Sequence, residues 1–248
     1  MTGELAIEAQ GIAKTYGTGD SAVTALRGVD LSARFGEMVA LVGPSGCGKT
    51  TFISILAGLL SRDGGQLRLA GVDPDALDNR ARTLWRRGNV GFIFQQFNLV
   101  PQISVLENVA IPLLLRGDRR SHALDRAAML LDRVGLKGRE RSRPTMLSGG
   151  QQQRVAIARS LVHEPRILVC DEPTSALDGS TGQRVMELVR EQGCRPDRLT
   201  VLVTHDERIF HFADRIVHMD DGRVTRVVDA RTEVAALRAA MAAEEDSR

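Results

Sequence analysis

The nine residues GPSGCGKTT, at positions 43–51, contain three glycines and a proline and end on a lysine and two threonines. Glycine has no Cβ, so the backbone N–H groups of such a loop can turn inward around an anion. The apolar run MVALVG before it is typical of a strand buried on both faces, and KTTFISILAGLL (49–60) has helical spacing. Strand, glycine loop and helix in this order predict a phosphate-binding loop rather than an ordinary tight turn.

The parts of this loop have distinct predicted roles. Lys49 is expected to reach the β- and γ-phosphates of a nucleotide, and the Thr50 hydroxyl to be a ligand of Mg²⁺. The positive end of the following helix adds to the attraction for the β-phosphate. By itself such a loop leaves many ATPase and GTPase classes open. The residues predicted to bind nucleotide here are Gly43, Pro44, Ser45, Gly46, Cys47, Gly48, Lys49, Thr50 and Thr51.

A second apolar run, ILVCDEP at 167–173, ends in two acids. Acids placed directly after four apolar residues are seldom there for solubility, although a surface carboxylate pair is the alternative. We expect Asp171 to hold Mg²⁺ through its water shell, and Glu172 to orient and polarise the attacking water.

The stretch LSGGQQQR, at 147–154, decides between the ATPase and GTPase classes that the phosphate loop leaves open. Ser148, Gly149 and Gly150 lie just ahead of a predicted helix that begins at Gln151, QQQRVAIARSLV, and form a second anion-binding helix terminus. One nucleotide does not need two such sites, so the sequence predicts a two-fold dimer in which each chain's second site closes on the γ-phosphate held by the other. Alone, Ser-Gly-Gly is also common N-cap chemistry.

The composition is that of an ordinary globular protein. It has 248 residues, 43% of them hydrophobic, and a formal net charge of +2, without the basic face or tail of a nucleic-acid-binding protein. No apolar run approaches the roughly 20 residues of a membrane span, and a signal peptide is not evident. The three cysteines, Cys47, Cys170 and Cys194, match no zinc or disulfide framework. We therefore expect a cytoplasmic protein with free thiols.

The remaining pattern predicts an α/β fold. Val29, Leu31, Ala33 and Phe35 alternate as in a half-buried antiparallel strand, and residues 104–162 are largely helical, with Leu124, Ala127, Ala128 and Leu131 on one face of HALDRAAMLLDRVG. A helix with Val185, Leu188 and Val189 facing inward, a buried strand LTVLV, a hairpin around Asp221-Gly222 and a C-terminal helix follow. Strands alternating with helices imply a parallel sheet, so the helical block is an inserted subdomain.

With these motifs in order, almost the whole chain resembles the nucleotide-binding subunit of ABC transporters. The resemblance implies ATP as the nucleotide and a P-loop NTPase fold, with a RecA-like parallel sheet core, an antiparallel β subdomain and an inserted α-helical subdomain. The corresponding parts are a core with its β subdomain at 1–97 and 163–230, the helical subdomain at 98–162, and a C-terminal helix and tail at 231–248.

The resemblance also assigns single residues. Gln95 in GFIFQQF resembles the glutamine that binds Mg²⁺ and acts as a hinge to the helical subdomain, with Gln96 as the alternative if the register shifts. Asp178, in SALD, resembles part of the loop that crosses the dimer interface. His205 resembles the switch histidine that contacts the γ-phosphate, and Tyr16 the aromatic residue that stacks on adenine, although it could also be a packed hairpin residue.

Within the family, GFIFQQFNLVPQISVLENVAIPLLLRG and LSGGQQQRVAIARSLVHEP resemble exporters of the macrolide-efflux and lipoprotein-releasing type, a group that includes the cell-division ATPase FtsE. VTHDERIFHFADRIVHMDDGRV resembles the DevA-like branch, whose relatives work with a membrane-fusion protein. This implies an ATP-driven homodimer on the inner face of the cell membrane, bound to MacB- or FtsX-like permease subunits and through them to a periplasmic fusion protein.

The resemblance leaves the cargo open. We expect export of, or transmembrane force transmission to, a hydrophobic or amphipathic substrate such as a lipid, lipoprotein or drug-like molecule. The alternative is an FtsE-like ATPase that regulates cell-wall enzymes without moving cargo. The segment FNLVPQISVLENV, at 97–109, is expected either to receive the permease or simply to pack within its subdomain.

Overall fold

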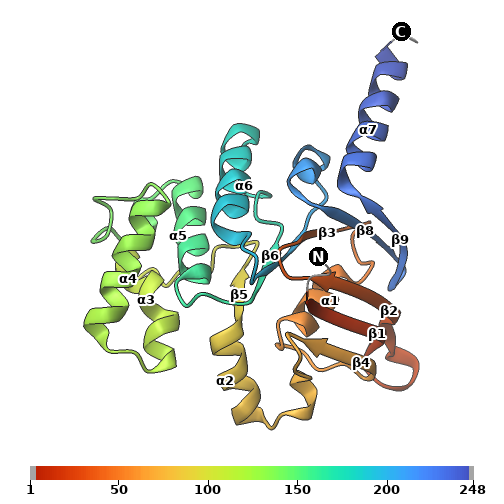
Figure 1. The fold of residues 1–248 in the computed structure, drawn as a ribbon, viewed down its shortest axis with the longest axis horizontal. Coiled ribbons are helices and arrows are strands. Elements are labelled where there is room, and N and C mark those ends of the chain that lie inside the picture. Colours follow the sequence, from red (N-terminus) through yellow and green to blue (C-terminus); the bar gives the residue numbers. More distant parts are fainter. Residues whose placement is uncertain (1–3, 246–248) are drawn as a thin grey trace.

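The computed structural model describes residues 4–245 of the chain. The central sheet has six strands in the order β5-β6-β7-β3-β8-β9, and a separate sheet has three in the order β2-β1-β4 (Figure 1). The strands are β1 Leu5–Tyr16, β2 Val23–Arg34, β3 Met38–Val42, β4 Gly64–Leu69, β5 Val90–Ile93, β6 Ile167–Asp171, β7 Leu199–Val203, β8 Arg215–Asp220 and β9 Arg223–Asp229. The helices are α1 Lys49–Leu56, α2 Asn79–Asn89, α3 Val105–Arg116, α4 Arg120–Arg133, α5 Gly149–Leu161, α6 Gly179–Gly193 and α7 Ala230–Glu245.

The central sheet is parallel from β5 to β8, and only β9 runs antiparallel to its neighbour. Strand β3 shows why its sequence is apolar throughout. Val39 and Leu41 face a core shared with α1 and the three-stranded sheet, whereas Met38, Ala40 and Val42 face a core shared with α6. Both faces of the sheet are therefore covered, as in other parallel sheets. The predicted α/β fold with a phosphate loop is confirmed.

The three-stranded sheet is antiparallel and contains the predicted alternating strand. Val29 lies opposite Ile12, and Leu31 opposite Ala9, with all four side chains buried. These cross-strand pairs form the part of the core between this sheet and α1.

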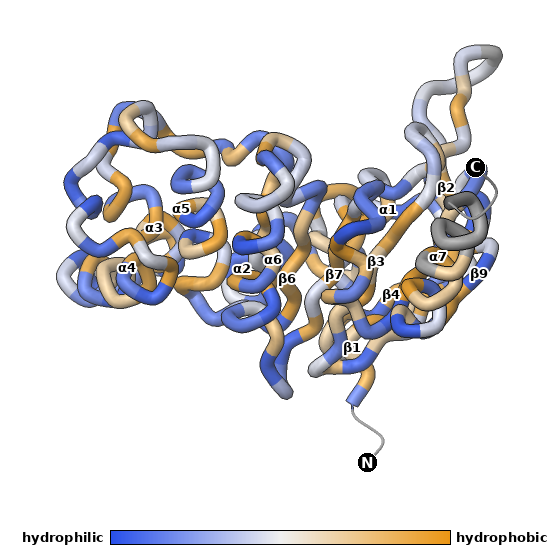
Figure 2. The backbone as a smooth tube through the Cα atoms, turned by 90° about the horizontal axis from the view of Figure 1, so that it is seen from above, coloured by the Kyte–Doolittle hydropathy of each residue, from blue (hydrophilic) through white to orange (hydrophobic). Residues whose placement is uncertain are grey.

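A third core joins α3, α4 and α5, which lie together at one end of the molecule, away from α7 (Figures 1 and 2). On α4 the buried residues are Ala123, Ala127 and Leu131, whereas Leu124 and Ala128 are half-buried, so the predicted inward face is rotated slightly. On α6, Val185 and Val189 are buried and Leu188 is half-buried. No helix within residues 4–245 combines the length and apolar character of a membrane span.

The structure confirms the predicted hairpin turn at Asp221-Gly222 but shortens the helix predicted over residues 49–60. The turn at Asp221-Gly222 joins β8 to β9 with positive φ at both residues, 39° and 72°, as a two-residue type I′ hairpin requires. The helix expected over 49–60 is too long: α1 ends at Leu56. Gly58 takes φ of 64° and donates to the carbonyl of Ile55, while Leu59 donates to that of Ser54, the Schellman arrangement that terminates helices.

Candidate nucleotide site

Neighbouring strands bring the site residues to one edge of the central sheet. Strands β6, β7 and β3 are adjacent and parallel, so their carboxyl ends lie side by side. The glycine loop follows β3, Asp171 ends β6, and His205 comes two residues after β7. Ligands of open α/β sheets bind outside this edge.

The glycines of the loop are required by close backbone approaches. Gly43 and Gly48 have φ values of 148° and 100°, in the region that favours glycine. A Cβ on Gly43 would collide with the carbonyl of Met219, and one on Gly48 with the carbonyl of Ala25. The loop can therefore lie this close to its neighbours only with glycine at both positions.

Helix α1 begins at this loop without a side-chain cap, because its N-cap residue is Gly48. By contrast, side chains of Ser104, Ser148 and Asp178 cap α3, α5 and α6. The open end of α1 faces a cavity of about 230 Å³ lined by Ala25, Ser45, Gly46, Gly48, Lys49, Thr50, Thr51 and Glu172. A helix N-terminus with free backbone donors in a hollow of this size fits a phosphate group.

Lys49 lies folded over the loop that precedes it. Its Nζ donates to the carbonyls of Gly43 and Pro44 at 2.7 and 2.8 Å, and lies 3.5 Å from Sγ of Cys47. The side chain is buried but lines the cavity. Cys47 is also buried, so its thiol is poorly exposed to alkylating reagents.

The acid pair occupies two different environments. Burial raises the pKa of Asp171, the neighbouring Glu172 raises it further, and Lys49 acts in the opposite direction. A carboxylate in this position favours a cation beside it. Among the described residues, no cluster of three or more His, Cys, Asp or Glu side chains could hold a metal alone. In nucleotide sites Mg²⁺ commonly takes one or two carboxylates together with phosphate oxygens and water.

Glu172 is held from several directions. Its backbone has a positive φ of 45°, and its N–H donates to the carbonyl of Val203 at 3.0 Å. Gln95 Nε2 donates to one carboxylate oxygen at 3.2 Å, and His205 Nδ1 lies 3.1 Å from the other. Gln95 and Gln96 both border a separate hollow beside residues 97–99, so the contact with Glu172 is what distinguishes Gln95. The structure thus brings Gln95, Glu172 and His205 together.

Tyr16 lies at the end of β1, with its hydroxyl 3.4 Å from Oγ1 of Thr51. Tyr16 is 43% exposed, and Nζ of Lys14 lies over its ring, 5.9 Å from the centroid. Behind it, Asp63 accepts hydrogen bonds from Nζ of Lys14 and the N–H of Thr15, which anchors this end of the strand.

Residues 148–151 form a reciprocal cap within their own chain. The N–H of Gln151 donates to Oγ of Ser148, and the N–H of Ser148 donates to Oε1 of Gln151. Asp178 caps α6, and its hydrogen bonds from Thr181 and Ser180 lower its pKa to about 2. Residues 148–151 and Asp178 do not line the phosphate cavity of their own chain.

Sequence reasoning missed several supporting residues. The N–H of Gly222 donates to the carbonyl of Cys47, so the β8–β9 turn supports the phosphate loop. Arg159 donates to the carbonyls of Phe97 and Asn98 and thereby fixes the segment after Gln95. The Asp-Gly turn itself was visible in the sequence, but its contact with a loop 175 residues earlier depends on the packing of β8 beside β3.

Comparison with known proteins identifies the family. Residues 26–175 match the model of the ABC transporter family. The lipoprotein-releasing system ATP-binding protein LolD of Legionella pneumophila is 40% identical over 88% of this chain and 96% of its own length. The macrolide export ATP-binding/permease protein MacB of Escherichia coli is 42% identical over 88% of this chain, which spans only 34% of MacB.

Solved structures agree with these relatives. The ATP-binding cassette MJ0796, in a dimeric post-hydrolysis state bound to ADP and Pi, has a TM-score of 0.83 and 37% identity, covering 90% of this chain and 98% of that one. The chain therefore belongs to the ABC transporter family, as one of its ATP-binding ATPase domains.

Proposed function

We propose that this chain hydrolyses ATP to drive export of, or force transmission to, a hydrophobic or amphipathic substrate through membrane subunits. The observation that carries the ATPase part is the convergence of the phosphate loop, Asp171 and Glu172 at one sheet edge. The transport part is supported by similarity to LolD and MacB. A lipid, lipoprotein or drug-like substrate would agree with the lipoprotein release and macrolide export that the names of these relatives state.

In this proposal the triphosphate lies at the N-terminus of α1, where Lys49 and the backbone N–H groups neutralise its charge. Glu172 accepts a proton from the attacking water, and Gln95 and His205 keep its carboxylate oriented. Their contacts with both oxygens of Glu172 support this assignment. Tyr16 would stack on the adenine ring, since it lies beside Thr51 at the rim of the cavity.

Mg²⁺ would be held by Thr50, Asp171 and Gln95 together with phosphate oxygens and water. The donor set is hard oxygen, and burial together with Glu172 outweighs Lys49 in setting the raised pKa of Asp171, so a further cation beside this carboxylate would be favourable. When bound, the ion would neutralise charge on the phosphates.

A homodimer would complete the site. Ser148, Gly149, Gly150 and Gln151 lie outside the cavity of their own chain, so their helix terminus is available to the nucleotide of a second copy. Asp178, at the start of α6, would lie at the same interface. The dimeric form of a similar cassette supports this arrangement.

The membrane partner would bind the surface around residues 97–109. One hollow there, of about 380 Å³, is lined in part by Phe97, Leu99 and Pro101. Arg159, which donates to the carbonyls of Phe97 and Asn98, also lines an apolar pocket of about 220 Å³. This pocket is bordered by Leu59 and Leu115, which are 51% and 55% exposed. MacB carries ATP-binding and permease parts in one protein, which supports a permease segment as the occupant.

This binding would hold the chain at the inner face of the membrane, with a fusion protein reached only through the permease. The test of the partner surface is co-purification from detergent-solubilised membranes with Leu59→Asp/Leu115→Asp, using Val227→Asp as the control, since Val227 is an exposed apolar residue on β9. Loss of the permease with the double variant alone is expected. Retention of the permease would contradict this docking surface.

The identity of the co-purified proteins also separates transport from the regulatory alternative. A permease with a fusion protein supports export, whereas cell-wall enzymes in place of cargo support regulation. Similarity to MacB and LolD favours transport.

ATP hydrolysis is tested by Glu172→Gln, which removes the proton acceptor but keeps the shape of the side chain. We expect phosphate release to fall by about 10²–10⁴-fold, the range typical of a lost general base. Glu191→Gln, at an exposed position of α6, is the matched control. Unchanged turnover in Glu172→Gln would contradict its proposed role.

A further inference from the structure

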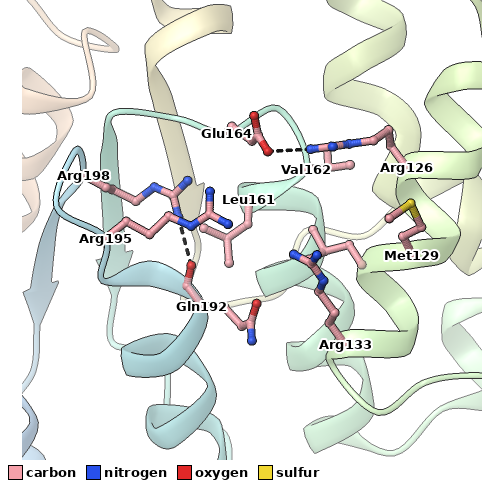
Figure 3. Close-up of a pocket in the computed structure, with 10 residues that line it drawn as sticks. Arg126, Met129, Arg133, Leu161, Val162, Glu164, Gln192, Arg195 and Arg198 are labelled. Atoms are coloured by element: carbon pink, nitrogen blue, oxygen red, sulfur yellow. Dashed lines mark hydrogen bonds and ion pairs between the residues drawn. The ribbon is translucent and has the colours of Figure 1, made fainter.

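A pocket far from the phosphate loop in sequence lies where α4, α5 and α6 end. Its volume is about 110 Å³, and its lining residues include Leu130, Leu161 and Gln192 from the last turns of these helices. Figure 3 shows the pocket between α4 on one side and the segment after α6 on the other. It therefore joins the helical block to the central core.

The lining is strongly basic. Arg126, Arg133, Arg195 and Arg198 line the pocket against a single carboxylate, that of Glu164. The formal excess is three positive charges around a small space with an apolar floor of Leu130, Leu161 and Val162. Charges beside such an apolar floor are less screened than charges in bulk water.

Two of the arginines have structural partners. Arg126 donates to Glu164 at 2.6 Å, and Arg198 donates to the carbonyls of Pro165 and Gln192 at 2.6 and 2.9 Å. Arg198 is only 4% exposed, and its burial lowers its pKa. Their cationic groups are therefore used to hold the loops at the helix ends.

The other two arginines of the lining, Arg133 and Arg195, are available to bind an anion. Within residues 4–245, the guanidinium groups of Arg133 and Arg195 make no hydrogen bond with a described residue, although the charge of Arg195 contributes to the lowered pKa of Glu164. Both extend into the space between α4 and the segment after α6 (Figure 3). A guanidinium group binds two oxygens of a tetrahedral anion in a bidentate manner, and one such group enters the pocket from each side.

Helix dipoles alone do not account for this charge. Each C-terminus carries roughly half a negative charge, so three helix ends offset about 1.5 of the three excess positive charges. One of these ends, at Gln192, is already capped by Arg198. An excess of positive charge remains at the mouth, where Arg133 and Arg195 are exposed.

We propose that this pocket binds a phosphate-class anion, either free phosphate or the phosphate of a lipid headgroup, between Arg133 and Arg195. The bound anion would link α4 to the segment after α6, and so the helical block to the core. The site is independent of the nucleotide pocket and of the proposed transport function.

The test is calorimetric titration of inorganic phosphate into the full chain carrying Lys49→Ala, which weakens binding at the phosphate loop. Ionic strength is kept constant with chloride. Adding Arg133→Gln/Arg195→Gln should weaken phosphate binding at least tenfold. The control, Arg80→Gln/Arg139→Gln, makes the same change of charge at exposed positions on α2 and after α4, and should leave binding unchanged. Equal melting temperatures without phosphate would exclude a folding defect.

The source of the phosphate is distinguished by sedimentation with phosphatidylcholine vesicles, with and without phosphatidic acid. Recruitment by phosphatidic acid that the Arg133/Arg195 variant loses would assign a headgroup, whereas titration without recruitment would assign a soluble anion. The proposal is overturned if the Lys49→Ala chain binds no phosphate at 10 mM, on the order of a hundredfold above a typical metabolite affinity, or if the Arg133/Arg195 variant binds it equally well.

Discussion

His205 and Glu172 form a direct contact across two neighbouring strands, with Nδ1 of the histidine 3.1 Å from Oε1 of the carboxylate. His205 follows β7 and Glu172 follows β6. Gln95 reaches the opposite carboxylate oxygen from the end of β5. The glutamate is thus positioned by residues from two other strands, and its orientation depends on both.

Removal of the histidine tests this dependence. In His205→Ala, Glu172 keeps Gln95 as a partner but loses one restraint, so we expect kcat to fall by about 10–100-fold, because a 1 Å misplacement of a reacting group can cost about 10²-fold. His211→Ala is the control, since His211 is exposed and stacks on Phe212 instead. Steady-state ATPase assays measure both. Equal activity of the two variants would argue against a role for His205.

The second prediction concerns Tyr16. Stacking of a base on an aromatic ring contributes about 1–3 kcal/mol, so Tyr16→Ala should raise the Kd for ATP by about tenfold. Tyr16→Phe keeps the ring and loses only the long 3.4 Å contact with Thr51, and should bind within about twofold of the parent. Fluorescent-nucleotide titration distinguishes them. If Phe weakened binding as much as Ala, the hydroxyl rather than the ring would matter.

The third prediction concerns pH. Burial, and then Glu172, raises the pKa of Asp171, so its ionised form destabilises the fold. This cost is absent below the unfolded pKa, about 3.9, and is complete above the folded pKa. Metal-free Asp171→Asn should therefore be more stable than the parent at pH 7, and this advantage should shrink as the pH falls toward about 4.

Thermal unfolding across this pH range is the measurement, and a gain of about 1 kcal/mol corresponds to about 2–4 °C in Tm. Asp125→Asn, at an exposed position of α4, should show no such gain. A lower Tm for Asp171→Asn at pH 7 would show that the carboxylate stabilises the empty site.

The fourth prediction separates backbone strain from support of the phosphate loop. Gly222 has φ of 72°, and a Cβ there would lie 2.8 Å from the carbonyl of Ala25. Gly138 has φ of 83° but open space around it. Gly138→Ala should lose about 1 kcal/mol of stability from its left-handed backbone alone, and Gly222→Ala should lose more, because its Cβ would also meet the carbonyl of Ala25. Only Gly222→Ala should weaken ATP binding, because its N–H supports Cys47. Equal ATP affinities would contradict this role.

Local chemistry explains what could be predicted from the sequence. The glycine loop, the acid pair at the end of β6 and the Asp-Gly turn are each specified by a few adjacent residues, because close approach, burial and positive φ restrict the amino acids allowed there. The apolar run of β3 predicted a parallel sheet, since both its faces are covered.

Contacts between distant segments could not be predicted in the same way. Gln95 and Glu172 are 77 residues apart in sequence, and their hydrogen bond depends on β5 pairing with β6. The length of α1 was overestimated because its apolar spacing continues past Gly58, which ends the helix through its left-handed backbone. Helix α2 has no fully buried residue and contacts the core through the half-buried Trp85, so its sequence shows little of the apolar periodicity that reveals a helix.

The shared nucleotide site is tested most directly by light scattering of the Glu172→Gln chain with ATP and Mg²⁺. The monomer mass is 27.0 kDa. We predict a species of about twice this mass with ATP, and its loss when Ser148→Arg is added to block the second phosphate contact. The dimeric mechanism would be contradicted if the mass of the chain alone stayed at 27.0 kDa under saturating ATP and if the permease, when added, bound only single copies of the chain.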